Sequence, residues 1–417
     1  MKNNYCPLYL LVACLTLMAA CSQIPEQKEF PQGYQLTSLR VPLRGSLYPS
    51  EMDLINDFLI ICSHSSIHIY SVKNYSFTSS LGYGKQPDSF QLPQFVRSST
   101  PHLYVMEVNN KNVIKKYQID SLGQPILLQT SFSGVVNPMH RPYIMRDSVI
   151  VYDEFIPEAS LKIHNLHTNT EVLAMPYGTT SLDDRFFDKN IGGLYANDSC
   201  MAFAYKYQDR IDFYDWQFNL KQSINHQQSE SKINPLDTRE NISYYGYSYM
   251  GRNYFYTLYR GVSNELFRSD SLLINTVPNI PITVYGLTRD ILEVYDLDGQ
   301  PVCRYSFTDV APSVFVVDEQ QNRLLGHRAS CADSLLVFQL QGLPKNGKPY
   351  HNSEKASFFS LPHIKEPDTP KEVVYHAHSK FQNDVAPTYY IRFGGADGRF
   401  FIVTESGRTS QAQIRQK

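Results

Sequence analysis

The sequence lacks most features that mark the common functional classes. It has a single tryptophan among 417 residues and a formal net charge of −2, so no basic field is available to gather nucleic-acid phosphates. It also contains no G-x-S-x-G, H-E-x-x-H or phosphate-loop pattern, which removes the sequence support for those catalytic chemistries. We therefore expect no nucleic-acid partner and no cofactor, and we do not predict an enzyme.

Cysteines are few and are not spaced for metal binding. Two of the seven fall within the first twenty residues, and the ones after Cys21 are Cys62, Cys200, Cys303 and Cys331. These four are far apart and lack any C-x-x-C spacing, so neither a zinc site nor a dense disulfide framework is indicated. Buried free thiols are expected, although Cys303 and Cys331 could meet if neighbouring repeats bring them together.

The chain has only one long uncharged apolar run, at residues 8–20, and Lys2 precedes it. About a dozen residues are too few to cross a hydrocarbon core of about 30 Å as a helix. A basic residue followed by a short apolar run is instead typical of a signal peptide, which we assign to residues 1–20.

The apolar run ends in Leu17-Met18-Ala19-Ala20-Cys21, which resembles the lipobox of bacterial lipoproteins. That resemblance implies cleavage before Cys21, lipidation of this residue by a diacylglyceryl group and a fatty acid such as palmitate, and anchoring in the cell envelope. Residues 21–33 are polar and would form a tether. Ser22 follows the cysteine, which favours the outer membrane under the usual sorting rule. An ordinary secreted protein is the alternative.

The main structural signal is a short strand that recurs six times. Each copy alternates apolar residues and ends in an aromatic residue or histidine followed by a polar residue. The copies lie at residues 67–71, 114–118, 161–165, 211–215, 292–296 and 335–339. A strand-like run precedes each copy across a turn, and most copies are followed by another.

Four short strands repeated about every 45–50 residues are typical of a propeller blade. We therefore predict an all-β, six-bladed β-propeller of four-stranded antiparallel blades over residues 34–340. Residues 34–43 alternate in the same way and are well placed to supply the outer strand of the last blade. An open array of sandwiches is the alternative, but the repeated strand is too regular for unrelated sheets.

The repeats resemble the six-bladed propellers of the NHL and TolB-like type found among bacterial lipoproteins. Residues 82–90 are similar to an inter-blade turn of that group, although Pro87 is displaced from its position there. Residues 258–261, 294–301 and 316–319 are similar to its fifth and sixth blades, including an aromatic-Asp-x-x-Gly turn at Tyr295-Asp296 to Gly299. The resemblance implies a fold and secretion, but no settled activity.

The pattern ends near residue 340. Residues 341–417 form a C-terminal extension that begins with a Pro- and Lys-rich stretch. Two alternating segments, residues 388–393 and 399–404, flank the glycine-rich stretch 394–398 and predict a hairpin.

Three groups of residues are candidates for ligand binding. His140 and Arg141 precede the first strand of the third predicted blade, so this cationic pair should lie near one mouth of the channel, where it could hold a carboxylate or phosphate. Tyr245 belongs to a tyrosine-rich run that could form a platform for a sugar or peptide. An exposed loop pair and ordinary packing between blades are the respective alternatives.

Acidic residues form the third group. Asp153-Glu154, Asp183-Asp184 and Asp188 could contribute to a calcium site at the channel mouth, and His376 and His378 share one face of an extended segment. Neither set has the spacing of a metal motif, so we predict no metal. The expected function is a membrane-tethered propeller that binds a protein, peptide or glycan. The alternative is a metal-dependent hydrolase of the lactonase or lyase type.

Overall fold

The computed structural model describes residues 30–343, with gaps, and three short strands near the C-terminus. The gaps are residues 45–46, 48, 64–65, 83, 85–89, 91–92, 108–112, 134, 136–138, 155–158, 178–189, 227–232, 235–238, 270, 278–279 and 286–289. The signal segment, Cys21, Asp183, Asp184, Asp188, His376 and His378 lie outside the described residues. Within the described part, no helix is long and apolar enough to cross a membrane.

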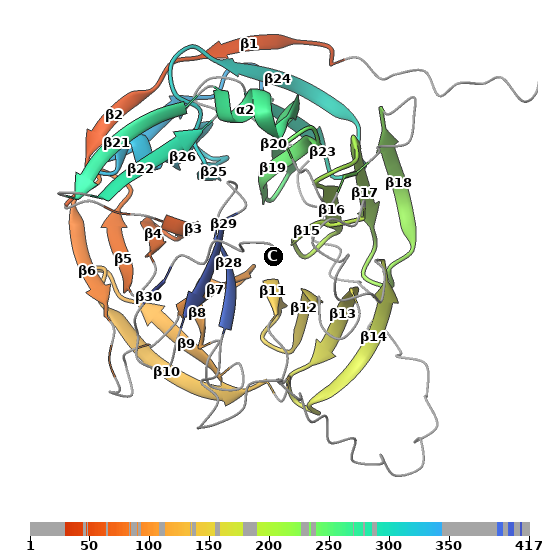
Figure 1. Ribbon diagram of the computed structural model, residues 1–417. Coiled ribbons are helices and arrows are strands. Elements are labelled where there is room, and N and C mark those ends of the chain that lie inside the picture. Colours follow the sequence, from red (N-terminus) through yellow and green to blue (C-terminus); the bar gives the residue numbers. More distant parts are fainter. Residues whose placement is uncertain are drawn as a thin grey trace, which may run out of the picture.

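The chain forms an all-β, propeller-like ring of small antiparallel sheets (Figure 1). Three sheets have four strands, and an eight-stranded sheet consists of two four-stranded meanders joined by a short parallel contact between β7 and β11. The eight-stranded sheet and the four-stranded sheets on either side of it in the chain contain the strands β3 (Pro49–Ile55), β4 (Phe58–Ser63), β5 (Ser66–Ser71), β6 (Phe77–Leu81), β7 (Pro93–Ser98), β8 (His102–Glu107), β9 (Val113–Ile119), β10 (Pro125–Phe132), β11 (His140–Met145), β12 (Val149–Glu154), β13 (Ser160–Asn165), β14 (Thr170–Pro176), β15 (Gly192–Ala196), β16 (Met201–Tyr205), β17 (Arg210–Tyr214) and β18 (Leu220–Asn225).

The remaining ring strands form a five-stranded sheet and the last four-stranded sheet. They are β1 (Gly33–Leu36), β2 (Leu39–Pro42), β19 (Ile242–Met250), β20 (Tyr254–Ser263), β23 (Ile291–Asp296), β24 (Pro301–Phe307), β25 (Val314–Asp318), β26 (Arg323–His327) and β27 (Ser334–Gln339). The six recurring segments of the sequence coincide with the third strands β5, β9, β13, β17, β23 and β27. The strand prediction is confirmed at these positions because period-two alternation follows directly from the pleat.

The first strands of the chain close the ring. β2 pairs antiparallel with β27 and completes the last sheet, whereas β1 adds in parallel to β24 of the preceding sheet. The predicted clasp at residues 34–43 is therefore present, but it is shared between two sheets. Pairing of β1 and β2 with strands near residue 300 and beyond ties distant parts of the chain together by backbone hydrogen bonds.

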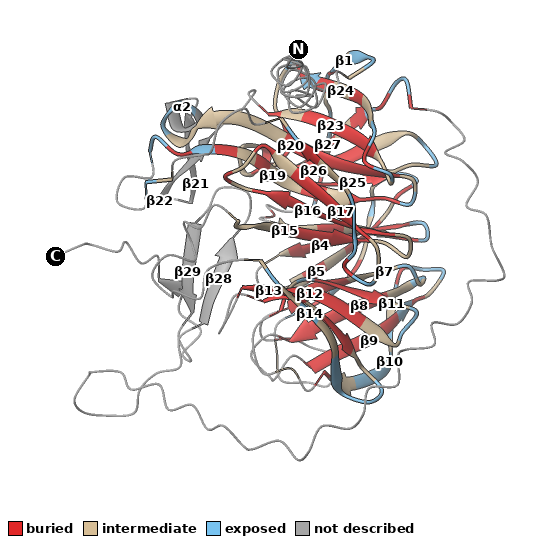
Figure 2. Ribbon diagram, turned by 90° about the vertical axis from the view of Figure 1, so that its right-hand side faces the viewer, coloured by how far each residue is buried: buried red, intermediate tan, exposed pale blue. Residues whose placement is uncertain are grey.

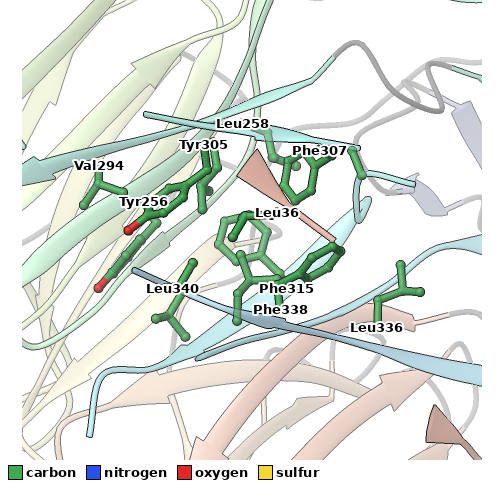
Figure 3. Packing of buried hydrophobic residues seen from close by; sticks show 14 of the residues in the cluster. Leu36, Tyr256, Leu258, Val294, Tyr305, Phe307, Phe315, Leu336, Phe338 and Leu340 are labelled. Carbon is green, nitrogen blue, oxygen red and sulfur yellow. The ribbon is translucent and has the colours of Figure 1, made fainter. Parts of the chain in front are cut away.

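The core lies between adjacent sheets, where aromatic and aliphatic side chains pack face to face. Figure 2 shows that buried residues fill the middle strands of each sheet, and exposed residues gather in the turns at the right-hand side. In the cluster drawn in Figure 3, Leu36 of β1 packs with Tyr305, Phe307 and Phe338, so the clasp is also held by apolar burial. Cys62, Cys200, Cys303 and Cys331 are buried thiols that form no disulfide among the described residues, as expected.

The two faces of the ring differ in their connections. Each meander has an even number of strands, so the chain returns to one face before it enters the next innermost strand. The opposite face, which we call the turn face, carries tight turns. Three of them are built alike, because Asp120, Asp215 and Asp296 each accept two backbone N–H bonds at 2.8–3.0 Å. The turn indicated by the sequence at Tyr295-Asp296 to Gly299 is therefore present, and Asp296 caps it.

The other face, which we call the loop face, carries the longer connections. One of them runs from β20 to β23 and contains α2 (Asn264–Ser269) and a hairpin of β21 (Ser271–Val277) and β22 (Ile280–Tyr285). The last connection of this face before the end of the ring contains the short helix η1 (Ala329–Cys331). No pattern in the sequence predicted that hairpin.

In the extension, β28 (Tyr390–Gly394) pairs antiparallel with β29 (Arg399–Val403), which in turn pairs with β30 (Thr409–Ser410). The hairpin predicted around residues 394–398 is therefore present.

Candidate functional site

The innermost strands β3, β7, β11, β15, β19 and β25 surround the axis of the ring, and each contacts its neighbours on both sides. β7 and β11 run parallel, with Tyr143 level with Arg97. Because β11 runs from His140 to Met145, His140 and Arg141 lie nearer the loop face than Arg97 does. The pair thus stands at one mouth of the axis, although it begins β11 instead of preceding it.

Arg141 is held in an unusual but defined position. It has a left-handed backbone with φ 45°, at an irregularity in the pairing of β11 with β12. Its side chain extends to the next innermost strand, where Nη1 donates to the carbonyl of Gly192 at 3.1 Å and the guanidinium lies 5.1 Å from the ring centroid of Tyr195. A Cβ at Gly193 would overlap the guanidinium. Glycine at this position therefore allows the arginine to lie across the strand.

Arg97 crosses the axis at a deeper level. Its Nη2 donates to the hydroxyl of Tyr247 at 2.7 Å, and its guanidinium lies 4.7 Å from the ring centroid of Tyr249. Arg97 comes from β7, and both tyrosines come from β19 on the opposite side of the ring. These side chains therefore form a plug across the axis, below Arg141 as seen from the loop face.

Three acidic residues surround the two guanidinium groups. Glu51 accepts a bond from the backbone N–H of Phe95 at 3.1 Å, and Asp53 accepts one from Leu54 at 2.9 Å. Burial raises the pKa of Asp53 despite the nearby Arg97 charge. Asp153 is fully buried, and neither of its side-chain oxygens has a hydrogen-bond partner among the described residues.

Burial raises the pKa of Asp153 to about 7, although the positive charge of Arg141 opposes this shift. His140 shifts in the other direction, because burial and then the charge of Arg141 lower its pKa well below the usual value. His140 is therefore neutral at pH 7, and Arg141 is the cationic member of the predicted pair. Arg141 is also the one of the two that is classed as exposed.

Tyr245 lies between two sheets instead of at the axis. It is buried, and its hydroxyl donates to Asp209 at 2.9 Å in the connection between β16 and β17. Burial raises its pKa well above the usual value, with the charges of nearby groups adding to the shift. Its role as a ligand contact stays a prediction, because Tyr245 lies outside the group of side chains at the axis.

Sequence reasoning did not single out Arg97, Tyr247 or Gly193. Arg97 and Tyr247 are 150 residues apart and meet only because the ring brings β7 opposite β19. The glycine pair at the start of β15 was the one available signal, because an isolated glycine in a strand often marks the close approach of another group.

The described residues contain no group of three or more His, Cys, Asp or Glu side chains that could hold a metal ion. Asp153 and Glu154 do not act together, since Glu154 instead forms an ion pair with Lys162 at 2.8 Å. The other three acidic residues considered for a calcium site, Asp183, Asp184 and Asp188, lie outside the described part.

No protein-family model matches the chain, and no curated protein sequence matches it. Among solved structures, it is similar to a Bacteroides fragilis protein described as exported, with 9% identity over 74% of this chain and 98% of that one and a TM-score of 0.47. BamB from Moraxella catarrhalis shares 12% identity over 74% and 96%, with a TM-score of 0.35. The WD40 repeats of RRP9 share 11% over 72% and 97%, with a TM-score of 0.43. Similarities of this size say nothing about ligand or activity.

Proposed function

We propose that this protein is a six-bladed, TolB-like propeller lipoprotein of the bacterial cell envelope that binds a partner at its loop face. The six blades would be the two meanders of the eight-stranded sheet and the four other ring sheets. Lipidation at Cys21 would anchor it, with the outer membrane as the expected location.

The observation that carries the binding function is the closed end of the axis. Arg97 and Tyr247 plug the ring, so a ligand entering from the loop face would meet a floor instead of a through-passage. Above this floor lies a charged group, Arg141, whose only hydrogen bond in the described part of the chain is to Gly192. A few oriented polar groups above an enclosed floor are a usual feature of binding sites.

Two exposed positions of the last ring sheet allow a matched test in intact cells. Asp333 lies in the loop-face connection before β27, and Gln321 lies in the turn-face connection between β25 and β26. We expect a photo-crosslinking residue at position 333 to give a discrete adduct in the envelope and the same residue at position 321 to give none. Equal labelling from both positions would contradict a loop-face binding module.

Anchoring is tested separately. The Cys21→Ala variant should fail to incorporate labelled fatty acid and should leave the membrane fraction, whereas Cys62→Ala should do neither, because Cys62 is a buried thiol of the ring. Continued labelling of the Cys21→Ala chain would refute the lipoprotein assignment.

The metal-dependent hydrolase has less support. It would require acidic and amide side chains from several sheets to converge on one ion, whereas the acidic side chains near the axis, Glu51, Asp53 and Asp153, lie beside the guanidinium groups of Arg97 and Arg141.

A further inference from the structure

We propose that the loop-face end of the axis binds a carboxylate of a peptide partner, with Arg141 as the principal anchor. The inference rests on the proposed binding function and names the chemistry that would carry it. Four properties of the site support it, namely the free donors of Arg141, the floor below it, the local charge balance and the occupied faces of the tyrosines.

Arg141 is prepared to donate. The carbonyl of Gly192 and the ring of Tyr195 hold its guanidinium in place, while its side chain remains exposed. A guanidinium has five N–H donors in a planar fork, and this fork matches a carboxylate with two parallel bonds. Because the side chain is already ordered, binding would cost less of its rotamer entropy.

The plug limits the shape of the ligand. Arg97 reaches Tyr247 across the axis, so a peptide cannot thread the ring at that level. A ligand can therefore insert only an end or a side chain. The carboxylate at the C-terminus of a chain and the carboxylate of an Asp or Glu side chain both satisfy this condition.

Charge favours a singly charged carboxylate over a doubly charged phosphate. Glu51 lies near both guanidinium groups, Asp53 near Arg97 and Asp153 near Arg141, and these carboxyl groups offset part of the positive charge. His140 adds no cation at neutral pH. A dianion would therefore meet too little positive charge, whereas a monoanion needs one guanidinium.

The tyrosines favour a peptide over a glycan. Recognition of a sugar ring uses a free aromatic face. Arg141 lies over the ring of Tyr195, and Arg97 lies over the rings of Tyr247 and Tyr249. These rings orient the guanidinium groups, so one face of each ring is already engaged by arginine.

Arg146 provides a matched control. It lies on the turn face, just after β11, and like Arg141 it is exposed with a left-handed backbone, at φ 49°. Replacing either residue by glutamine therefore removes one charge at the same backbone cost. Gly193→Ala adds a second control, because it would displace the guanidinium of Arg141 without removing its charge.

The test is a selection of random peptides on the full chain in detergent, followed by affinity measurements on the enriched peptides. Each peptide is remade with an amidated C-terminus and, separately, with Glu and Asp changed to Gln and Asn. We expect one of these two changes to weaken binding at least about tenfold, and the arm that does so identifies the source of the carboxylate. Arg141→Gln and Gly193→Ala should weaken binding similarly, and Arg146→Gln should not.

Three results would overturn the inference. These are a selection that enriches no peptide, peptides whose affinity is unaffected by both changes, and stronger competition by inorganic phosphate or glucuronate than by acetate. If crosslinking from position 333 persists in an Arg141→Gln chain, the loop-face function stands and the carboxylate anchor fails.

Discussion

Two adjacent glycines in β15 should respond differently to the same substitution. At Gly192 a Cβ would overlap the backbone carbonyl of Ala204 and the ring of Phe203, both fixed in the neighbouring strand β16. At Gly193 the three atoms nearest to the Cβ all belong to the guanidinium of Arg141, which ends a flexible side chain. Neither glycine has a left-handed φ, so the backbone accommodates alanine at both positions.

The magnitudes follow from what has to move. Overpacking against a fixed backbone costs typically about 1–3 kcal/mol, which we expect for Gly192→Ala. In the Gly193→Ala chain, Arg141 loses its hydrogen bond to the carbonyl of Gly192, worth about 1 kcal/mol, and its contact with the ring of Tyr195, worth about 0.5–1 kcal/mol. Alanine also lowers the conformational entropy of the unfolded chain, which stabilises the folded state by about 0.4–1 kcal/mol. We therefore expect Gly193→Ala to cost about 0.5–1.6 kcal/mol.

Two measurements separate the variants. Urea denaturation should show a lower midpoint for Gly192→Ala than for Gly193→Ala. Modification by phenylglyoxal, followed by mass spectrometry, should be faster at Arg141 in the Gly193→Ala chain, with Arg146 as the internal reference. Equal destabilisation of both variants, or an unchanged rate at Arg141, would refute the placement of this side chain across β15.

Three further predictions concern stability. Burial raises the pKa of Asp153 to about 7, so ionisation of Asp153 opposes folding, and the free energy of unfolding should fall as the pH rises from about 4 to about 7. Asp153→Asn should flatten this fall and raise the free energy of unfolding at pH 8 by more than about 1 kcal/mol, which urea denaturation at about pH 4 and at pH 8 would show. Burial tends to raise the pKa of Asp215, but bonds from Asn219 and Gln217 outweigh it and lower the pKa, so the stabilisation is present above the unfolded value and lost in acid. Asp215→Asn should lose this acid dependence, and an unchanged pH profile would count against the turn. Leu36→Ala should cost about 2–5 kcal/mol and increase amide exchange in β1, whereas a small cost would mean that the clasp adds little.

Much of the fold could be predicted because each strand carries its own pattern. A pleated strand places successive side chains on opposite faces, so a segment such as residues 292–296 shows its conformation by alternation alone. The turn after it is also local, since Asp296 bonds to N–H groups within four residues. The clasp was partly predictable, but its division between β24 and β27 depends on how the two sheets meet.

The axial site was only half predictable. His140 and Arg141 stood out as adjacent cations at the start of a predicted blade, and the structure places them at the axis. The low pKa of His140 depends on burial inside the ring and on the charge of Arg141, and no local pattern records the burial. Tyr245 and Tyr247 looked equivalent in the tyrosine-rich run, yet one bonds to Asp209 between sheets and the other to Arg97 at the axis.

The sequence by itself determined the strands, their turns and the order in which they follow, because these depend on alternation and on hydrogen bonds between near neighbours. Tertiary structure alone decided which side chains share the axis. Ring closure brings Arg97 to Tyr247 and Arg141 to the backbone of β15, and these contacts join residues 150 and 51 positions apart. Such pairs form only after every sheet has taken its place around the ring.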